Sequence, residues 1–206
     1  MFIKKIIEKR IGNYKTFNKN EIIFHENDVC EHIGIVTDGS VSVKNIFSNG
    51  NEILIKRIKE EETFGEHLIF SSYNRYPASI ISNSDNTKIL FISKNSLMKM
   101  LNTDVELLYQ FINHLSDYGI QLNNRLKTLS KRSIREKITY YIYLNTIAKN
   151  SYNFKITILE DIASIINCDR VSFSREFNKL IKEGIIEYNK KTISVLDIES
   201  LINNIK

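Results

Sequence analysis

The chain has 206 residues, 42% of them hydrophobic and 26% charged, which is enough for one large domain or two small ones. One proline and seven glycines exclude collagen-like and Pro/Gly-rich disordered classes. No apolar run approaches the roughly 18 residues that cross a membrane, and the N-terminal stretch lacks the features of a secretory signal. The two cysteines, Cys30 and Cys168, lie far apart and in no metal-ligand spacing. The composition therefore predicts a reduced, cytoplasmic protein with no metal site and no membrane partner.

The excess positive charge lies in the C-terminal part. Residues 1–124 carry 14 Lys/Arg against 15 Asp/Glu, whereas residues 125–206 carry 15 against 9. Such asymmetry favours a polyanion partner for the C-terminal part and another role for the rest. The alternative from charge alone is a random scatter on a basic protein.

Short strands are expected over residues 17–93, where apolar and polar residues alternate. The turn dipeptides Asn27-Asp28, Asp38-Gly39 and Asn49-Gly50 separate them. Asn-Gly between two alternating runs is a strong hairpin signal, because both residues adopt positive φ at low cost. Regular strands with no helices between them predict an antiparallel barrel, roll or sandwich.

The hydrophobic period changes near Ser93, which, like Asn95, is a suitable cap for a short helix over 94–101. A longer helix is expected from about residues 102–104, and its apolar residues recur mainly in steps of three and four. This pattern is typical of a seam between two copies of a helix, and the alternative is an internal core helix. The predicted dimer seam is Leu108, Phe111, Leu115, Tyr118, Leu122 and Leu129, widened by Leu107, Ile112 and Leu126.

A polar, basic stretch over 128–133 interrupts this pattern and marks a domain junction. Two capping boxes follow, Ser133-Ile-Arg-Glu136 and Thr157-Ile-Leu-Glu160, and each predicts the start of a helix. The second of these helices is expected over 159–166.

A further helix is predicted from Arg170, with Asp169 as its N-cap and Gly184 just past its end. Two short strands about the turn Asn189-Lys190-Lys191 come next and form a wing. Two helices, a tight turn and a hairpin match the winged helix-turn-helix pattern. The alternative is an ordinary helical hairpin with a solvated basic face. The predicted buried stripe of the second helix is Phe173, Phe177, Leu180 and Ile181.

Nearly the whole chain resembles the Crp/Fnr superfamily of bacterial transcription factors. The elements come in the same order, which is a strand-rich half, a long helix and a winged helix-turn-helix. The family's recognition helix begins Ser/Cys-Arg-Glu-Thr/Ser-Val-Ser/Gly-Arg, and this chain has Asp169-Arg170-Val171-Ser172-Phe173-Ser174-Arg175. Both arginines match and offer the fork that suits the acceptors of guanine. Val171 replaces the family's glutamate, which accepts from cytosine, and a valine would contact a thymine methyl instead. The predicted DNA-binding residues are Arg170, Val171, Ser172, Ser174, Arg175, Lys179, Lys190 and Lys191.

The N-terminal half is similar to the family's cyclic-nucleotide-binding β-roll. The segment Thr63-Phe64-Gly65-Glu66-His67-Leu68 looks like the start of its phosphate-binding cassette, where the glycine admits the phosphate and the glutamate accepts from the ribose. The family's phosphate-pairing arginine is replaced by Tyr76, and Arg75 stands one residue early, which in a strand turns a side chain to the other face. We therefore expect that cyclic AMP is not the effector, and Gly65-Glu66 then persists as a tight turn and helix cap. The predicted effector pocket is Gly65, Glu66, Arg75, Tyr76 and Ser79.

The sequence does not assign a cofactor for any other way of sensing a signal. An iron–sulfur cluster needs about four cysteines, and the chain has two. A haem would need an axial ligand, and Cys30 in a turn is a candidate redox thiol, whereas Cys168 is expected to be a small packing residue. A small-molecule effector of unknown identity remains open. The candidate haem ligands are His25, His32, His67 and His114.

The sequence thus predicts an α+β protein with three parts: a β-roll effector domain (1–102), a dimerisation helix (103–129) and a winged helix-turn-helix (130–206). The function expected is a homodimeric regulator with its recognition helix over 170–183 in the major groove of a palindromic operator. RNA polymerase is a further partner that the resemblance allows. No catalytic arrangement, phosphate-binding loop or dinucleotide fingerprint is present, so we do not expect an enzyme. The alternative is a cyclic-nucleotide-binding or protein-docking module with a vestigial helix-turn-helix.

Overall fold

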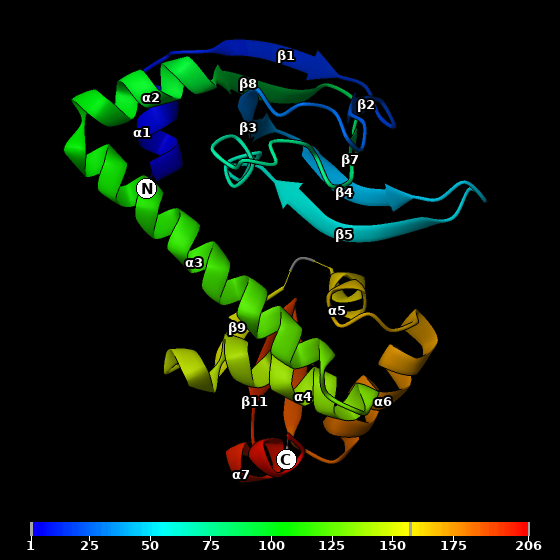
Figure 1. The fold of residues 1–206 in the computed structure, drawn as a ribbon. Helices are drawn as coiled ribbons and strands as arrows, with labels where there is room; N and C mark the ends of the chain where they lie inside the picture. The colour runs from blue at the N-terminus through cyan, green and yellow to red at the C-terminus, as the bar shows by residue number, and fades with distance from the viewer. Residues whose placement is uncertain (1, 157, 206) are drawn as a thin grey trace. The chain divides into compact units, whose positions relative to one another are not determined.

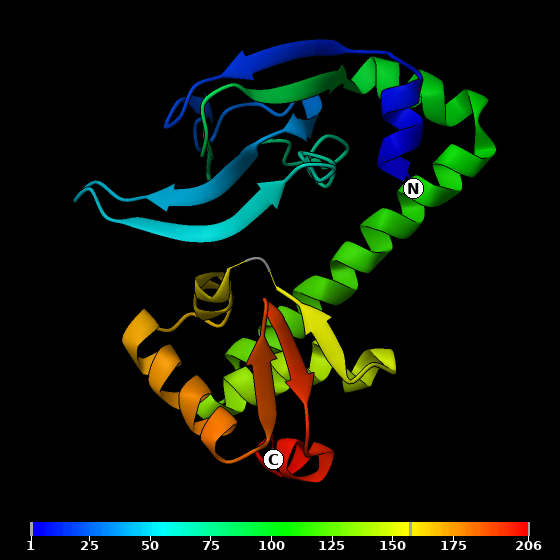
Figure 2. The same ribbon diagram turned by 180° about the vertical axis from the view of Figure 1, so that it is seen from behind.

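The computed structural model describes residues 2–156 and 158–205, and the chain divides into two compact units. The first unit is Met1–Tyr118 and the second is Gly119–Lys206, so the division falls inside one long helix. Figures 1 and 2 show the two units from opposite sides. Each unit has its own hydrophobic core. Within the described ranges, no helix is long and apolar enough to cross a bilayer, and no group of three or more His, Cys, Asp or Glu residues forms a metal site.

The first unit is built on two antiparallel sheets of four strands each, with the orders β1-β8-β3-β6 and β2-β7-β4-β5 (Figure 1). This confirms the predicted β-roll. Its strands are strongly apolar where both faces are covered: Ile33, Ile35 and Ile89 are fully buried. The strands are β1 (Asn13–Phe17), β2 (Ile22–Phe24), β3 (His32–Asp38), β4 (Ser40–Ile46), β5 (Glu52–Lys59), β6 (Thr63–Phe64), β7 (Ser79–Ser82) and β8 (Thr87–Ser93).

The Asn49-Gly50 signal correctly predicts a hairpin. Strands β4 and β5 pair from Ser40 opposite Lys59 to Ile46 opposite Glu52. Gly50 closes the connection with a φ of +82°, a conformation that glycine adopts without steric cost.

Three helices accompany these sheets: α1 (Phe2–Glu8), α2 (Lys94–Thr103) and the first part of α3 (Val105–Leu129). The side chain of Ser93 caps α2 as predicted, accepting a hydrogen bond from the backbone N–H of Ser96 at 3.2 Å. Asp104 caps α3 in the same way, accepting from the N–H of Leu107 at 2.9 Å. No cap or sustained period in the sequence marks α1, which is held by burying Phe2 in the core.

One face of α3 packs inside the first unit, and two members of the predicted dimer seam, Phe111 and Tyr118, lie on it. Phe111 is only 3% exposed and packs against Phe2, with 5.3 Å between ring centroids. The ring of Tyr118 stacks on that of His67 at 3.6 Å. Phe111 is therefore buried within its own domain and Tyr118 is half-buried there, and the seam predicted from the sequence stays a prediction.

The second unit combines the last part of α3 and the helices that follow it with a small antiparallel sheet of the order β10-β11-β9 (Figure 2). The predicted capping box at Ser133 is confirmed, because its side chain accepts from the N–H of Glu136 at 3.1 Å. The predicted box at 157–160 depends on Thr157, which lies outside the described residues. The elements after α3 are α4 (Ile134–Asn145), the 3-10 turn η1 (Ile147–Lys149), β9 (Asn153–Lys155), α5 (Leu159–Ile165), α6 (Arg170–Lys182), β10 (Ile186–Asn189), β11 (Thr192–Val195) and α7 (Ile198–Asn203).

Helices α5 and α6 with the hairpin β10–β11 form the predicted winged helix-turn-helix. Gly184 ends the α6 segment with a φ of +72°, as expected of a residue just past a helix. The wing turn is Lys190-Lys191, both with positive φ, which matches the right-handed twist of a two-residue hairpin. Arg135 of α4 pairs with Glu183 and thereby fixes the end of α6 against α4.

Candidate nucleic-acid interface and effector region

Helix α6 is positioned by its cap and by its buried stripe. The Asp169 carboxylate accepts from the N–H of Ser172 at 2.8 Å, and this bond holds the pKa of Asp169 below its usual range. Phe173 and Phe177 are each 1% exposed, and Leu180 is fully buried. Because residues three and four apart share one helix face, burial of this stripe turns the opposite face of α6 to solvent.

The outward face of α6 carries the residues predicted to contact bases. Val171 is 79% exposed, and the side chain of Arg175 is 67% exposed. Arg175 Nε lies 3.6 Å from Oε1 of Glu176, and Lys179 Nζ donates to the same oxygen at 2.9 Å. Glu176 thus neutralises part of the charge at the middle of α6 without covering Arg175. Of the other predicted contacts, Arg170 is exposed, and Ser172 and Ser174 are half-buried.

The wing presents Lys190 and Lys191 at its tip, where both residues are exposed. An ammonium group on a flexible stem suits phosphate oxygens and carries no base information. The second unit therefore combines a helix face fitted to base edges with a cationic turn fitted to the backbone.

Aromatic rings fill the interior of the roll near the predicted effector pocket. Tyr76 is 2% exposed and its ring stacks on Phe24, with 4.5 Å between centroids. Phe64 lies directly on the backbone of Gly34, where an added Cβ would come within 2.0 Å of the ring. Burial raises the pKa of the Tyr76 hydroxyl, so it stays neutral. The space beside Tyr76 is therefore occupied by the chain's own side chains.

Gly65 forms a close backbone turn beneath Tyr76. Its φ is +85°, and an added Cβ would lie 3.3 Å from the Tyr76 hydroxyl and 2.9 Å from the His32 carbonyl oxygen. The thiol of Cys30, 1% exposed, points at the Gly65 carbonyl oxygen at 3.6 Å. Burial raises the pKa of that thiol, which is the opposite of what a reactive thiolate needs. Burial and the raised pKa thus argue against a redox role for Cys30, which stays a prediction from the sequence.

Arg75 and Tyr76 face opposite ways, as neighbouring residues of an extended chain do. Arg75 is exposed, and its guanidinium donates to the carbonyl oxygen of Asn27 at 2.7 Å. Ser79 is 5% exposed and accepts from the N–H of Glu26 at 3.2 Å. The structure thus brings Gly65, Glu66 and Tyr76 together and leaves Arg75 outside.

Glu66 is a buried carboxylate, 2% exposed, held between two histidines. Its Oε1 lies 3.3 Å from Nε2 of His67 and 3.3 Å from Nε2 of His114 on α3. Burial acts to raise the pKa of Glu66, but the hydrogen bond from His114 and the electrostatic interaction with His67 outweigh it, so the net pKa is lowered. The sequence marks these histidines only as haem candidates, and nothing in it shows that both face one carboxylate.

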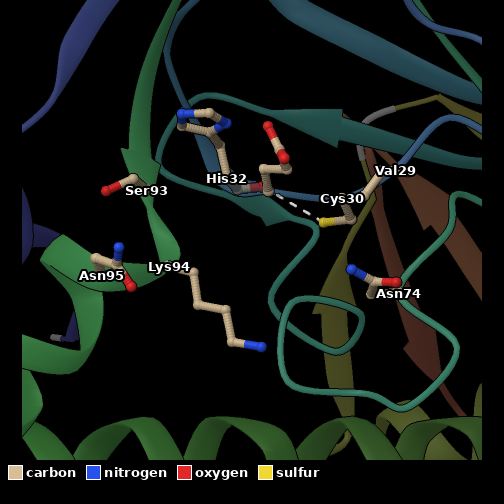
Figure 3. A pocket seen from close by; sticks show the side chains of 8 residues that line it. Val29, Cys30, His32, Asn74, Ser93, Lys94 and Asn95 are labelled. Carbon is tan, nitrogen blue, oxygen red and sulfur yellow. Dashed lines mark hydrogen bonds between the residues drawn. The ribbon is translucent and has the colours of Figure 1, made fainter.

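A separate pocket of about 380 Å³ opens beside Cys30 (Figure 3). It lies where β3 begins and α2 starts, and Figure 3 shows Lys94 and Asn74 on two of its sides. None of the five predicted effector residues lines it. The lining residues are Val29, Cys30, Glu31, His32, Asn74, Ser93, Lys94 and Asn95.

A second face of α3 remains exposed along the helix. Ile112 is 51% exposed, Leu122 is 48% exposed and Leu126 is 59% exposed. Together with Leu108 and the half-buried Leu115 they follow a spacing of three and four residues, in which Gly119 takes one position without a side chain. The sequence pattern includes Ile112 and Leu126 only as additions that widen the predicted dimer seam, because Phe111 and Tyr118 form an equally regular pattern.

Comparison with known proteins agrees with both halves of this description. Residues 14–104 match the profile of the cyclic nucleotide-binding domain, and residues 143–203 match that of the Crp-like helix-turn-helix domain. A transcriptional regulator of Thermotoga maritima with a solved structure is 30% identical, over 64% of this chain and 100% of its own, with a TM-score of 0.57.

Two curated proteins extend the likeness over most of the chain. The HTH-type transcriptional regulator ycf28 of Porphyra purpurea is 28% identical over 188 residues, 88% of this chain and 77% of its own. The anaerobic regulatory protein of Bacillus subtilis is 23% identical over 189 residues, 87% of this chain and 78% of its own.

A β-roll of the cyclic-nucleotide-binding type followed by a Crp-like helix-turn-helix defines a transcription regulator that binds DNA. The chain belongs to the Crp/Fnr family of these regulators. The predicted family and fold class are confirmed.

Proposed function

We propose that this regulator is a homodimer that binds a palindromic operator, with α6 lying in the major groove. The observation that carries the proposal is the outward face of α6, where Val171 and Arg175 stand exposed opposite a buried Phe173-Phe177 stripe. In this proposal residues 1–102 form the effector part, 103–129 the dimerisation helix and 130–206 the DNA-binding part. RNA polymerase as a further partner stays a prediction from the family resemblance.

Each DNA-facing residue has a chemical role in the proposal. Arg170 and Arg175 donate to O6 and N7 of guanine, and Val171 contacts a thymine methyl group. Lys179, Lys190 and Lys191 neutralise phosphates, and the N-terminus of α6 adds backbone N–H donors. The operator is therefore expected to contain both guanine and thymine at the positions facing the first two turns of α6.

The exposed face of α3 supports self-association. Its residues follow a spacing of three and four along the helix, the repeat with which two helices bury a common seam. This register retains Leu108, Leu115, Leu122 and Leu129 and omits Phe111 and Tyr118. The proposed seam is Val105, Leu108, Ile112, Leu115, Gly119, Leu122, Leu126 and Leu129.

We expect cyclic AMP not to bind this protein. Tyr76 occupies the position where the family carries its phosphate-pairing arginine, and Glu66 is engaged by His67 and His114. The absence of one charge-assisted hydrogen bond alone costs about 1.5–3 kcal/mol, or roughly 10- to 100-fold in affinity. Isothermal titration calorimetry with cyclic AMP at micromolar concentrations should give no binding heat. A saturable heat at one site per chain would contradict this interpretation of Tyr76.

The proposed function is tested by selecting bound sequences from a random pool of duplex DNA with the purified full chain. The expected result is one enriched motif with two inverted half-sites whose centres lie about 10 base pairs, or ~34 Å, apart. A pool that stays random would show that the helix-turn-helix is vestigial and that the chain is a docking module. An enriched motif without two inverted half-sites would support sequence-specific DNA recognition but would exclude the homodimeric arrangement.

A further inference from the structure

The Glu66 cluster, which consists of Glu66, His67 and His114, joins two separate elements of the first unit. Glu66 and His67 follow β6 with only Gly65 between, whereas His114 belongs to α3. Nε2 of each histidine lies 3.3 Å from the same carboxylate oxygen, and Thr63 Oγ1 lies 3.4 Å from Nε2 of His114. The cluster is thus a polar contact between the Thr63–Leu68 segment and the long helix.

The positions of the protons follow from the chemistry of the cluster. An ionised carboxylate offers only lone pairs, so the histidine nitrogens that face it must be the protonated ones. In His67 this is Nε2, and the remaining nitrogen, Nδ1, is buried without a hydrogen-bond partner in the part of the chain that the structure describes. A second proton on His67 would therefore create a buried N–H with no acceptor, which costs free energy.

The surroundings of His67 add to that cost. Its ring is stacked on Tyr118, and the titratable side chains that act on it besides Glu66 are Lys56 of β5 and His114 of α3. Burial lowers the pKa of His67, Glu66 acts to raise it, and Lys56 and His114 lower it further. Cys30 and Tyr76 also interact electrostatically with Glu66, and both are neutral because burial raises the pKa of each.

We propose that the Glu66 cluster is a proton-sensitive contact that holds α3 to the Thr63–Leu68 segment when His67 is neutral and releases it when His67 is protonated. The direction follows from linkage. A histidine whose pKa is lower in the closed state stabilises that state above its ordinary pKa of about 6.5 and loses this contribution as the pH falls. Acidification therefore loosens the contact, and the inference does not depend on DNA binding.

Amide hydrogen exchange on the full chain tests the proposal at about pH 7.5 and about pH 5.5, after correction for the intrinsic exchange rates. Protection of peptides covering 63–69 and 111–118 should fall, by up to about tenfold for each unit that separates the open and closed pKa of His67. Peptides from α6 serve as the internal reference, and a metal chelator in every buffer removes metal binding as a cause.

His67→Gln keeps an N–H donor but cannot take a second proton, so its protection should become independent of pH in this range. His25→Gln is the matched control, because His25 is exposed and should leave the pH response unchanged. The proposal is overturned if His67→Gln retains the full response, or if protection rises on acidification. Histidine NMR on the unmodified protein decides independently of any variant, since a His67 ring that titrates at or above about 6.5 would exclude the proposal.

Discussion

A protein in which Arg175 is replaced by alanine should lose its preference for one base pair in each half-site of the operator. Arg175 stands on the outward face of α6 with 67% of its side chain exposed, and its guanidinium can donate two hydrogen bonds to one guanine. Removing such a bidentate pair of hydrogen bonds costs about 1–3 kcal/mol, which is roughly 5- to 150-fold in affinity for each half-site. The affinity for DNA with that base pair already changed should fall much less.

The measurement is a titration of the selected operator, and of a single-base variant at each position, by fluorescence anisotropy. Replacing both Lys190 and Lys191 by alanine is the matched control, because these lysines are expected to contact phosphates only. That variant should bind all sequences more weakly to a similar degree, and its salt slope should fall by about 0.9 for each phosphate that is no longer neutralised. If Arg175→Ala keeps the base preference and changes only the salt slope, Arg175 is a phosphate contact and the proposed role is wrong.

Local signals predicted the ends of the elements because each depends on a short-range hydrogen bond or backbone angle. Ser93, Ser133 and Asp169 are caps in the sequence and in the structure alike. Gly50 and Gly184 take the positive φ for which glycine is favoured. The hairpin of the wing was likewise predicted from its turn, although Lys190 and Lys191 adopt there the left-handed conformation that glycine or asparagine usually adopts.

The face of α3 that meets its own domain could not be predicted, because two apolar stripes share this helix. Leu107, Phe111 and Tyr118 form one regular series, and Leu108, Ile112 and Leu126 contribute to another. Helical periodicity identifies stripes but does not say which one is covered by the same chain. Phe111 of the first stripe is buried because Phe2 of α1 packs on it, and α1 itself has no clear sequence signal.

The Glu66 cluster illustrates a second limit. Glu66 and His67 are adjacent in sequence, but His114 lies 48 residues from Glu66, and only the packed structure brings them together. The substitution of Tyr76 for an arginine was visible in the sequence. That its ring would stack on Phe24 and fill the roll required coordinates, because an aromatic residue in a strand is equally suited to a surface or a core.

Replacing Ile112 by aspartate should convert the protein from a dimer to a monomer. Ile112 is 51% exposed in the single chain, so the change should leave the fold of the chain intact. In the proposed dimer the same position lies in a dry seam, where each copy would lose about 1.5–3 kcal/mol of apolar burial and would bring a charge out of water. The dimer dissociation constant should rise by at least about 100-fold, as measured by sedimentation equilibrium.

Gln121→Asp is the matched control for Ile112→Asp. Gln121 is exposed and stands nine residues beyond Ile112, about two and a half turns, so it lies on the opposite side of α3. It adds the same charge to the same helix and should leave the dimer unchanged. Because two linked half-sites bind far more tightly than one, the Ile112→Asp monomer should also lose most of its affinity for the full operator while still binding a single half-site. An Ile112→Asp protein that remains dimeric, or a Gln121→Asp protein that dissociates equally, would show that the exposed stripe of α3 is not the seam.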